Sequence, residues 1–529
     1  MSIVLLTALR KKRGSLVSLF LSILLLFAVF SGIAFRFSNL DLKPYWHDEV
    51  YTSLRISGYG GQEALNQVSG QVVDARQLFK YQCASEEKSI IDTVRSLYVD
   101  DPQHPPLFYV LETIWNKVFG KCSVATTRSL SALFGVFAIP MFYFLVREIF
   151  SSERIALLSA AFFSLSPIQI RYSQEARQYS LLLLLIVISS FVLLKALKNH
   201  SKLGWALYSF FITLGLYCHL LTLFSMFGHF VIAVSIKTHR RTKNVCYFLA
   251  ASIFSTILFI PWLLVLYKGQ NKATGQTKWL ANNLEFGVLI EKWIDNINRV
   301  VVTDININIF STILACAIAV LLIYSAYFLC TRTQKWLVVF GIGAMPILLL
   351  LTIDLLRSGQ SSTISHYSLI SCCVFYISLA YLLSKKIGFL DKTGKEGKIW
   401  CVVTVLLIAS SIASDIHILK QESWWNLSQF DADSAKIIDN SDRPIVFSDG
   451  SFGELLPLIY KVDENTKFAY KIDCDRFNAM DSIDPKDDVF LYQSSESYVK
   501  RVSEVLGETA RIIYQFKENS LTVSLFKMY

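Results

Sequence analysis

Long apolar runs separated by short charged segments make up most of the first 420 residues. Runs of this length indicate transmembrane helices, because about 20 apolar residues are needed to cross the hydrocarbon core of a bilayer. Hydropathy and charge place eleven spans near residues 15–36, 125–146, 155–171, 179–196, 203–218, 220–236, 245–266, 307–329, 336–355, 366–384 and 399–418. The pattern therefore predicts a polytopic α-helical membrane protein.

The segment 419–529 has a different pattern, rich in charge and with alternating apolar residues. Strands are expected at 444–448, 488–492, 511–514 and 521–526, and helices at 451–460 and 496–506. Strands that alternate with helices predict a small α/β domain. We therefore expect a transmembrane module, 1–418, followed by an extracytoplasmic α/β domain, 419–529.

A long segment, 37–124, separates the first two expected spans. Within it, residues 106–120 form an apolar run of about 15 residues that carries Glu112, Asn116 and Lys117, so it is too short and too polar to span. An amphipathic helix in the membrane interface fits this run better. We expect 37–124 to be a large first outer loop with interfacial helices, belonging to the module 1–418.

Basic residues indicate the orientation. If the amino terminus, with its basic cluster at 10–13, is cytoplasmic, every later cluster between spans falls on the same side, as the positive-inside rule requires. These clusters lie at 147–154, 195–202, 237–243, 332–335 and 385–398. The segments expected on the outer face are then 37–124, 171–178, 267–306, 357–366 and the tail after 419.

Composition agrees with a membrane protein. The chain is 53% hydrophobic with a mean hydropathy of +0.44, which is too apolar for a soluble globular protein. The net charge of +10 is explained by the clusters between spans, so no nucleic-acid partner is expected. Most of the ten cysteines lie in apolar runs, and their spacing indicates no zinc site. Cys83 and Cys122 both fall on the outer face, and the sequence leaves their pairing open.

Three carboxylates on the expected outer face are candidates for catalysis. Asp48 and Glu49 are adjacent in the first outer loop, and Glu175 lies in the turn near 171–178. An aspartate is ionised at neutral pH and can accept a proton, while a second carboxylate can orient it or hold a divalent cation such as Mg²⁺ or Mn²⁺. Asp48, Glu49 and Glu175 are thus the candidate catalytic residues and the candidate cation ligands; a solvated loop pair is the alternative for Asp48 and Glu49.

Several cations and donors share that face. Arg171 and Arg177 flank Glu175, and Lys268 ends its span, so these three can hold a phosphate. His366 and Tyr367 close an outer turn and can add donors to the same phosphate. The alternative for the arginines is anchorage of helix ends in the headgroup layer. The residues expected to shape the site are His104, Tyr179 and His219, although His219 fits a neutral hydrogen-bonded role equally well.

Five segments together resemble the GT-C superfamily of polyprenyl-phosphate-sugar-dependent glycosyltransferases. They read WHDEV at 46–50, HPPLFY at 104–109, RSLSALFG at 128–135, SQEARQY at 173–179 and YCH at 217–219. The resemblance is to bacterial family 39-like enzymes related to protein O-mannosyltransferases and aminoarabinose transferases, and it covers about residues 15–385. The wording DPQHPPL at 101–107 resembles a subgroup frequent in cyanobacteria.

The resemblance implies an outward-facing site under the first loop. Asp48 matches the catalytic aspartate, Glu175 matches the acidic position of the second outer loop, and Arg177 falls beside the donor phosphate. One position departs from the family pattern. Where relatives often carry Arg-Tyr near the start of a late span, this chain has His366-Tyr367, so contact with the lipid phosphate is expected to be weaker or pH-dependent.

These observations lead to one main hypothesis. The chain is expected to move a sugar from a polyprenyl-phosphate donor to an extracytoplasmic glycan, lipid or protein by direct displacement, with Asp48 as general base. The expected location is the bacterial cytoplasmic (inner) membrane. The alternatives are a secondary transporter or lipid flippase, and an inactive scaffold for cell-envelope assembly. An enzyme is favoured over a transporter because the ionisable residues concentrate in one outer layer and no internal repeat is evident.

Overall fold

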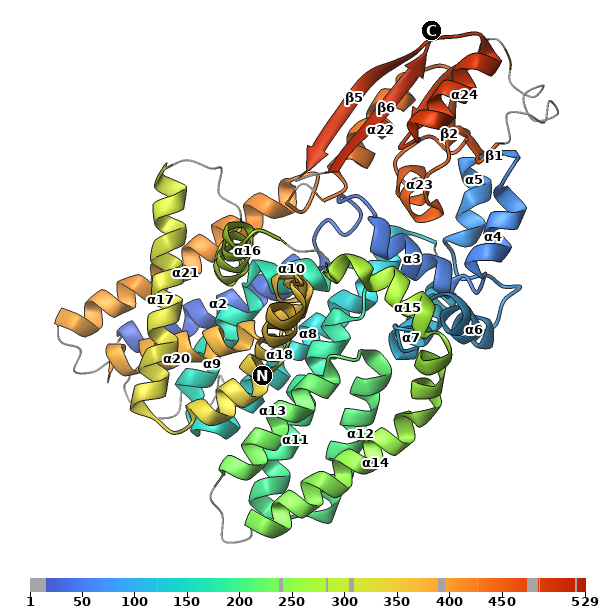
Figure 1. Ribbon diagram of the computed structural model, residues 1–529. Coiled ribbons are helices and arrows are strands. Elements are labelled where there is room, and N and C mark those ends of the chain that lie inside the picture. The colour runs from blue at the N-terminus through green and yellow to red at the C-terminus, as the bar shows by residue number, and fades with distance from the viewer. Residues whose placement is uncertain are drawn as a thin grey trace. The chain divides into compact units, whose positions relative to one another are not determined.

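The computed structural model describes residues 16–120, 122–236, 241–281, 284–303, 309–388, 395–425, 427–472, 484, 486–518 and 521–529. It is mostly helical and contains a single sheet among these residues (Figure 1). The basic clusters at 10–13 and 237–240, and part of the cluster at 385–398, lie outside the described residues.

The chain forms two compact units. We call residues 1–38, 103–105 and 131–420 the helical unit, and residues 39–102, 106–130 and 421–529 the α/β unit. The predicted boundary near 418 lies close to the unit boundary at 420. The first outer loop, however, groups with the carboxyl-terminal segment rather than with the transmembrane helices.

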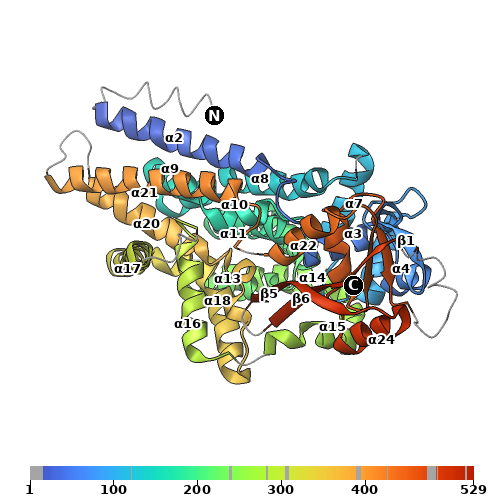
Figure 2. The same cartoon turned by 90° about the horizontal axis from the view of Figure 1, so that it is seen from above.

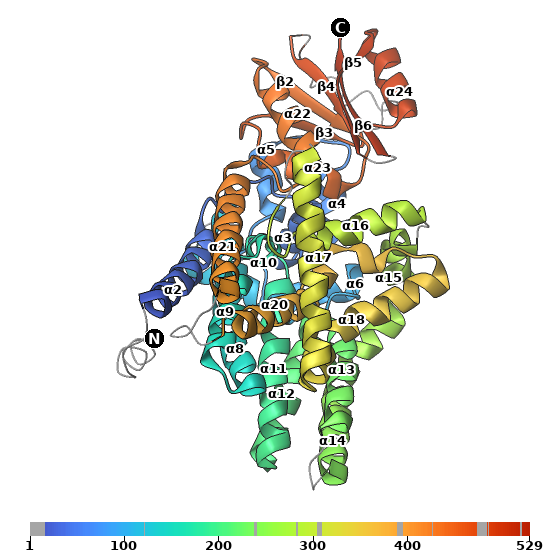
Figure 3. The same cartoon turned by 90° about the vertical axis from the view of Figure 1, so that its left-hand side faces the viewer.

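The helical unit is built from long apolar helices and shorter connecting ones. They are α2 (Leu16–Phe37), α8 (Val124–Phe150, which starts in the α/β unit), α9 (Glu153–Ser164), α10 (Pro167–Ser173), α11 (Tyr179–Asn199), α12 (Lys202–Cys218), α13 (Thr222–Ser235), α14 (Arg241–Lys268), α15 (Gln270–Thr277), η2 (Lys278–Ala281), α16 (Phe286–Asn298), α17 (Ile309–Arg332), α18 (Trp336–Arg357), η3 (Ser361–Thr363), α19 (Ser365–Ser368), α20 (Cys372–Ile387) and α21 (Lys395–Lys420). Figure 2 shows α2, α9, α20 and α21 side by side, and Figure 3 shows α11 to α14 grouped together.

Helices occupy all eleven positions expected for spans, but they are not all long. Among the described residues, seven helices are long and apolar enough to cross a membrane, namely α2, α8, α11, α14, α17, α18 and α21. The other four expected spans are shorter: 203–218 is α12, 220–236 is α13, and the span expected at 366–384 begins only at Cys372 as α20. The segment 267–306, expected as a loop, contains α15, η2 and α16.

The remaining expected span, 155–171, is broken. Helices α9 and α10 meet at an angle of 61° and form at most one bent span. The break follows from Pro167, since the residue before a proline avoids the helical conformation and proline suits the first turn of the next helix. Ser166 accordingly has extended φ and ψ angles of −72° and 121°. The break sets the direction of α10, which leads into the turn that carries Glu175.

The α/β unit combines the first outer loop with the carboxyl-terminal segment. Its helices are α3 (His47–Ile56), α4 (Gly61–Val68), α5 (Ala75–Leu78), η1 (Phe79–Tyr81), α6 (Ile90–Asp100), α7 (Leu107–Phe119), α22 (Gln429–Asp439), α23 (Phe452–Ile459) and α24 (Glu496–Leu506). Its strands are β1 (Val72–Asp74), β2 (Pro444–Ser448), β3 (Lys467–Tyr470), β4 (Asp488–Tyr492), β5 (Ala510–Glu518) and β6 (Leu521–Met528).

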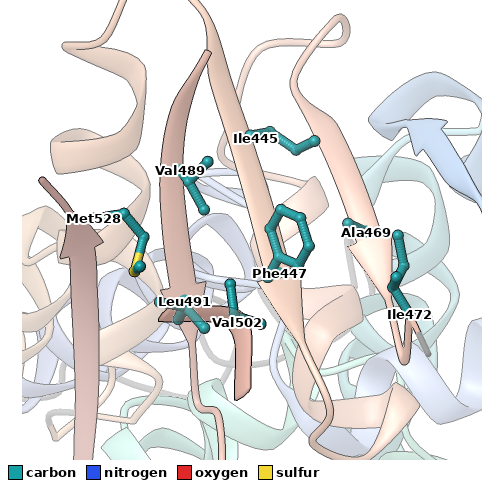
Figure 4. Close-up of a cluster of buried hydrophobic side chains, with 8 residues drawn as sticks. All are labelled: Ile445, Phe447, Ala469, Ile472, Val489, Leu491, Val502 and Met528. Carbon is teal, nitrogen blue, oxygen red and sulfur yellow. The ribbon is translucent and has the colours of Figure 1, made fainter. Parts of the chain in front are cut away.

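The strands form one mixed sheet in the order β1-β3-β2-β4-β6-β5. Strand β2 pairs in parallel with β3 and β4, while the β5–β6 hairpin is antiparallel. Successive side chains of a strand point to opposite faces, so one face of β2 and β4 supplies an apolar cluster with Val502 of α24. Figure 4 shows this cluster, which consists of Ile445, Phe447, Ala469, Ile472, Val489, Leu491, Val502 and Met528.

Strand β1 of the first outer loop completes the sheet. Val72 pairs with Ala469 and Asp74 with Lys467 in antiparallel register, next to the carboxyl-terminal strand β3. A disulfide joins Cys83 and Cys122, whose Cα atoms are 5.3 Å apart. The loop is therefore a folded part of the α/β unit, and β1 was missed because three residues carry too short an alternation to be recognised in sequence.

Candidate functional site

Asp48 and Glu49 lie in the first turn of α3, in the α/β unit. Trp46 is extended (φ −89°, ψ 171°), and its N–H donates to Glu49 Oε2 at 3.4 Å, which fixes the start of the helix. Two carboxylates at this position are favoured by the positive end of the helix dipole. The two side chains nevertheless differ: Asp48 is half-buried, whereas Glu49 is fully buried.

Glu49 is paired with Arg128, at the start of α8. Arg128 Nε donates to Glu49 Oε1 at 2.8 Å, and Nη2 donates to Glu49 Oε2 at 2.6 Å. The other donors of this guanidinium go to the carbonyl oxygens of Leu40, Lys43 and Pro44, at 2.7 to 3.2 Å. All five N–H groups of Arg128 are thus used. Glu49 therefore ties the chain that leads into α3 to Arg128.

A second arginine holds the other end of α3. Arg55 Nη1 donates to Asp100 at 3.2 Å, and Arg55 Nε lies 3.7 Å from Asp101. Asp100 also accepts from the N–H of Gly61 at 2.7 Å. Asp100 and Asp101, which the sequence places on the same face as Asp48, thus join α3, α4 and α6 in the structure.

A buried carboxylate of α7 was missed by the sequence reasoning. Glu112 is fully buried and accepts from Asn116 Nδ2 at 2.8 Å. Burial raises the pKa of the Glu112 carboxyl well above 4.5, and the negative charge of Glu49 adds to this effect. The apolar run around Glu112 predicted an amphipathic helix. The sequence pattern did not indicate that Glu112 is buried near Glu49.

The second group of candidate residues lies between α10 and α11, in the helical unit. Arg171 Nε donates to Glu175 Oε1 at 2.9 Å, and both side chains are buried. Arg177 is also buried, and its Nη2 lies 3.3 Å from His104 Nε2. Two arginines surround one carboxylate, so these three side chains carry a net positive charge that suits an anion.

Aromatic rings surround the two arginines. The Arg171 guanidinium lies 4.9 Å from the centre of the Tyr172 ring, and that of Arg177 lies 5.8 Å from the centre of Tyr179. His366 stacks on Tyr179, with ring centres 4.2 Å apart and 16° between planes. The structure therefore brings together Arg171, Arg177, Tyr179 and His366, as the sequence predicted.

Two more of the predicted residues join this group. His219 lies 5.9 Å from Tyr179 and 6.1 Å from Tyr367 between ring centres, and Tyr367 meets His366 edge to face at 4.5 Å. His219 Nδ1 accepts from the N–H of Leu221 at 3.0 Å, so the neutral ring carries its proton on Nε2. The sequence left two roles open for His219, a neutral hydrogen-bonded histidine and a residue that shapes the site. Its hydrogen bond agrees with the first role, and its place beside Tyr179 agrees with the second.

His219 and His366 are neutral near pH 7. Burial, followed by the charge of Arg177, lowers the pKa of His366 well below 6.5. Burial and the neighbouring His104 lower the pKa of His219 to about 3. The expected charge change of His366 between pH 5 and 8 therefore does not take place in the unliganded protein.

Lys268 stands apart from this group. It is the last residue of α14 and is exposed. Over the part of the chain that the structure describes, no hydrogen bond, ion pair or ring contact joins it to Arg171 or Arg177. Its role as a phosphate-binding residue stays a prediction.

Two of the three carboxylates proposed as cation ligands have an arginine partner. Glu49 is occupied by Arg128, and Glu175 is bonded to Arg171. Across the described residues, no group of three or more His, Cys, Asp and Glu side chains is arranged to hold a metal ion. A bound Mg²⁺ or Mn²⁺ stays a prediction.

Residues 103–265 match the model of the family described as dolichyl-phosphate-mannose-protein mannosyltransferase. The fold is similar to that of ArnT from Cupriavidus metallidurans, at a TM-score of 0.51 and 10% identity over 96% of this chain and 98% of that chain. The resemblance to GT-C glycosyltransferases is confirmed. The matched part of the chain includes His104, Glu175, Arg177 and His219, and the cyanobacterial subgroup stays a prediction.

A weaker likeness relates this chain to a larger enzyme. It aligns with the oligosaccharyltransferase AglB from Archaeoglobus fulgidus at a TM-score of 0.46 and 13% identity, over 85% of this chain and 65% of that one. A second structure of the Archaeoglobus fulgidus oligosaccharyltransferase gives a TM-score of 0.43 and 14% identity, over 84% of this chain and 62% of that one. This chain thus spans slightly less than two thirds of the archaeal enzyme. Among curated proteins, none matches the chain.

Proposed function

We propose that this chain is a membrane glycosyltransferase that moves a sugar from a polyprenyl-phosphate carrier to an extracytoplasmic acceptor. The observation that carries the proposal is the buried, net positive turn between α10 and α11. Arg171 and Arg177 are buried there beside Glu175 and near His366, whose pKa is lowered by burial so that it is neutral at pH 7. Guanidinium groups bind phosphate with paired, charge-assisted hydrogen bonds, so two arginines in one turn suit a phosphate ligand.

The fold neighbour supports a lipid-phosphate ligand. The structure of ArnT from Cupriavidus metallidurans was determined with bound undecaprenyl phosphate. The long apolar helices of the present chain place it in a bilayer, which is also where the polyprenyl chain of such a lipid resides. The positive turn then holds the phosphate, and the lipid chain stays in the membrane.

The proposed reaction is a direct displacement with Asp48 as base. The acceptor hydroxyl loses its proton to the Asp48 carboxylate, and its oxygen forms a bond to the anomeric carbon of the sugar. The bond between that carbon and the phosphate oxygen breaks, and polyprenyl phosphate leaves with the electron pair. Arg177 and Arg171 stabilise the charge on the departing phosphate. Displacement in one step inverts the anomeric configuration, and no step passes through a cation.

The roles of the carboxylates follow from their partners. Asp48 is half-buried and therefore within reach of an acceptor, whereas Glu49 is buried against Arg128. We assign the base to Asp48 and a positioning role to Glu49. Glu175 holds Arg171 in place by its hydrogen bond at 2.9 Å.

The orientation proposed for this enzyme puts the amino terminus in the cytoplasm of a bacterium and the reaction on the outer face of its cytoplasmic membrane. Reporters fused after Asn271 or at Tyr529 should then be extracytoplasmic, and one fused after Thr242 should be cytoplasmic. With a cytoplasmic amino terminus, the eleven expected spans put Tyr529 outside the cytoplasm. A cytoplasmic reporter at Tyr529 would show that the chain has an even number of spans.

The activity is tested with purified protein and synthetic polyprenyl-phosphate sugars. Release of free polyprenyl phosphate and transfer of labelled sugar are measured together, with a panel of glycan, lipid and peptide acceptors. A flippase would move the labelled lipid across a vesicle without cleaving it, and a scaffold would do neither. Movement of intact lipid with no cleavage for any donor would overturn the proposal.

A further inference from the structure

We propose that the carboxyl-terminal segment positions Asp48, through a contact of α23 and Tyr460 with helix α3 and the residues that precede it. This inference rests on the proposed function, since it gives Asp48 the role of base. All the residues concerned lie in the α/β unit. The segment after 419 then has a mechanical role in the transfer reaction, and Gly453 and Tyr460 are positioning residues.

The first outer loop is fixed to the carboxyl-terminal sheet by backbone bonds. Besides the β1–β3 pairing, the N–H of Gly70 donates to Tyr470 O at 3.0 Å, and that of Ala75 donates to Thr466 O at 2.9 Å. Backbone bonds of a sheet define a register and a distance. The sheet therefore supplies a fixed frame for the loop that contains α3 (Figure 1).

Helix α23 packs directly against α3. Gly453, in the first turn of α23, faces the ring of Tyr51, which lies one turn after Asp48 in α3. A methyl group at Gly453 would overlap this ring, with the Tyr51 Cζ atom only 2.6 Å away. A closer approach than real side chains allow shows that glycine is what permits this spacing between the two helices.

Tyr460 makes a second contact just after α23 ends. Its ring lies 4.6 Å from the Tyr45 ring and 5.1 Å from the Phe79 ring, between centres. Its hydroxyl donates to Gln82 Oε1 at 3.1 Å, and Gln82 Nε2 donates to the carbonyl of Val50 in α3 at 3.2 Å. Tyr45 in turn bonds to Ser53 at 2.7 Å. Tyr460 thus reaches both the chain before α3 and the helix itself.

These contacts fix the segment that carries Asp48. A general base must lie within hydrogen-bonding distance of the proton it accepts, and a displacement of about 1 Å can cost about a hundredfold in rate. Arg128 and Arg55 hold α3 from within the first outer loop and the start of α8. The contacts with Gly453 and Tyr460 add a support that comes from the carboxyl-terminal segment.

The test compares Gly453→Ala with Gly287→Ala. Both glycines are the second residue of a helix, α23 and α16, and alanine is favoured over glycine within helices by about 1 kcal/mol. A methyl at Gly287 meets no atom within 4 Å, whereas one at Gly453 meets Tyr51. We expect Gly453→Ala to lower kcat about ten- to a hundredfold with the KM for the lipid donor nearly unchanged, and Gly287→Ala to have no effect.

A double-mutant cycle with Tyr51→Ala tests the route of the effect. The added methyl has room once the ring is removed, so Gly453→Ala should have little further effect in the Tyr51→Ala background. Equal effects in both backgrounds, or a Gly453→Ala protein as active as Gly287→Ala, would overturn the proposal.

Hydrogen exchange of the α3 amides separates this inference from the proposed function. Gly453→Ala should speed exchange in α3 relative to Gly287→Ala, whatever the protein catalyses, and unchanged exchange would exclude the contact with α3. If exchange changes but Asp48→Asn has full activity, the base assignment fails while the contact stands. If Asp48→Asn is inactive and exchange is unchanged, the contact fails while the base assignment stands.

Discussion

Two buried pairs of glutamate and arginine, one in each unit, do different work. The Glu49–Arg128 pair joins residues 79 positions apart, and its guanidinium gives every N–H group to the protein. The Glu175–Arg171 pair joins residues 4 positions apart in one turn, with Arg177 nearby as a second cation. In the first pair every guanidinium N–H is bonded within the protein, while the second pair lies in a turn that holds a second arginine.

The difference between the two pairs shows that burial of a charged side chain does not by itself indicate a function. Glu49 is more buried than Asp48, yet its bonds to Arg128 explain it as a support for the chain around α3. Arg171 and Arg177 are buried in one turn with Glu175, and guanidinium groups in such a place can bind an anionic ligand by charge-assisted hydrogen bonds. Four substitutions test this contrast.

The largest effect is expected at Asp48. Asp48→Asn keeps the shape of the side chain but removes the proton acceptor, so turnover should fall by about 10²- to 10⁴-fold. Binding of polyprenyl phosphate should be almost unchanged, because Asp48 does not hold the phosphate in this scheme. Turnover is measured as release of lipid phosphate and affinity by titration with the unreactive lipid.

Asp74→Asn is the control for this substitution. Asp74 caps α5 and is exposed, and asparagine caps a helix as well as aspartate does, so activity should stay normal. A correctly inserted Asp48→Asn protein with near-normal turnover would move the base to another carboxylate, with Glu175 the next to test.

The next effect concerns stability rather than chemistry. Glu49→Gln leaves the Arg128 charge buried without its partner, which should cost about 3–5 kcal/mol in the free energy of unfolding. Unfolding is measured in mixtures of sodium dodecyl sulfate and a mild detergent. The same substitution at Glu464, whose pair with Arg76 is 65% and 70% exposed, should cost less than about 1 kcal/mol. Similar costs at both sites would remove the distinction between the two kinds of pair.

Arg177→Lys probes the phosphate. Lysine keeps the charge but lacks the planar fork, and the loss of one charge-assisted hydrogen bond costs about 1.5–3 kcal/mol, or about ten- to a hundredfold in affinity. Titration with polyprenyl phosphate measures this change. Arg147→Lys, at an arginine that is 51% exposed beside Glu153, is the control and should bind as the wild type does. Equal affinities of the Arg177→Lys and control proteins would leave Arg177 without a role in phosphate binding.

The smallest effect is expected at His366, where the family resemblance leads us to expect arginine. His366 is neutral in the unliganded protein because burial and Arg177 lower its pKa. A bound phosphate raises that pKa, so the complex takes up a proton, and wild-type affinity should fall as pH rises through the pKa of the complex. Arginine stays charged and can stack on Tyr179 in the same way, so His366→Arg should bind about fivefold more tightly with less dependence on pH.

Both proteins are titrated with polyprenyl phosphate between pH 5 and 8, so that ionisation of the lipid itself affects both equally. Polyprenol, which lacks the phosphate, is the control and should show no difference. Identical affinities and pH profiles would mean that His366 only packs against Tyr179.

The apolar pattern was sufficient to predict the membrane helices but not how each one ends. Helices were found at all eleven expected positions because an apolar segment in a bilayer must satisfy its backbone groups internally, which a helix does. The break between α9 and α10 depends on Pro167, which the hydropathy pattern does not register. In the carboxyl-terminal segment, the strands expected at 444–448 and 488–492 were found at those residues, whereas β3 was missed. The short strand β1 of the first outer loop was also missed.

The sequence by itself determined the kinds of residue on which the chemistry depends. The order of the motifs, the arginines beside Glu175 and the pair Asp48-Glu49 are local features, and local features can be recognised in one chain. Only the tertiary structure decided that Glu49 belongs to Arg128, that β1 joins the carboxyl-terminal sheet, and that His366 is neutral against Tyr179. The physical reason is that burial and pairing depend on which distant segments meet. A sequence pattern states the propensity of each segment, but the choice of partner is made by packing.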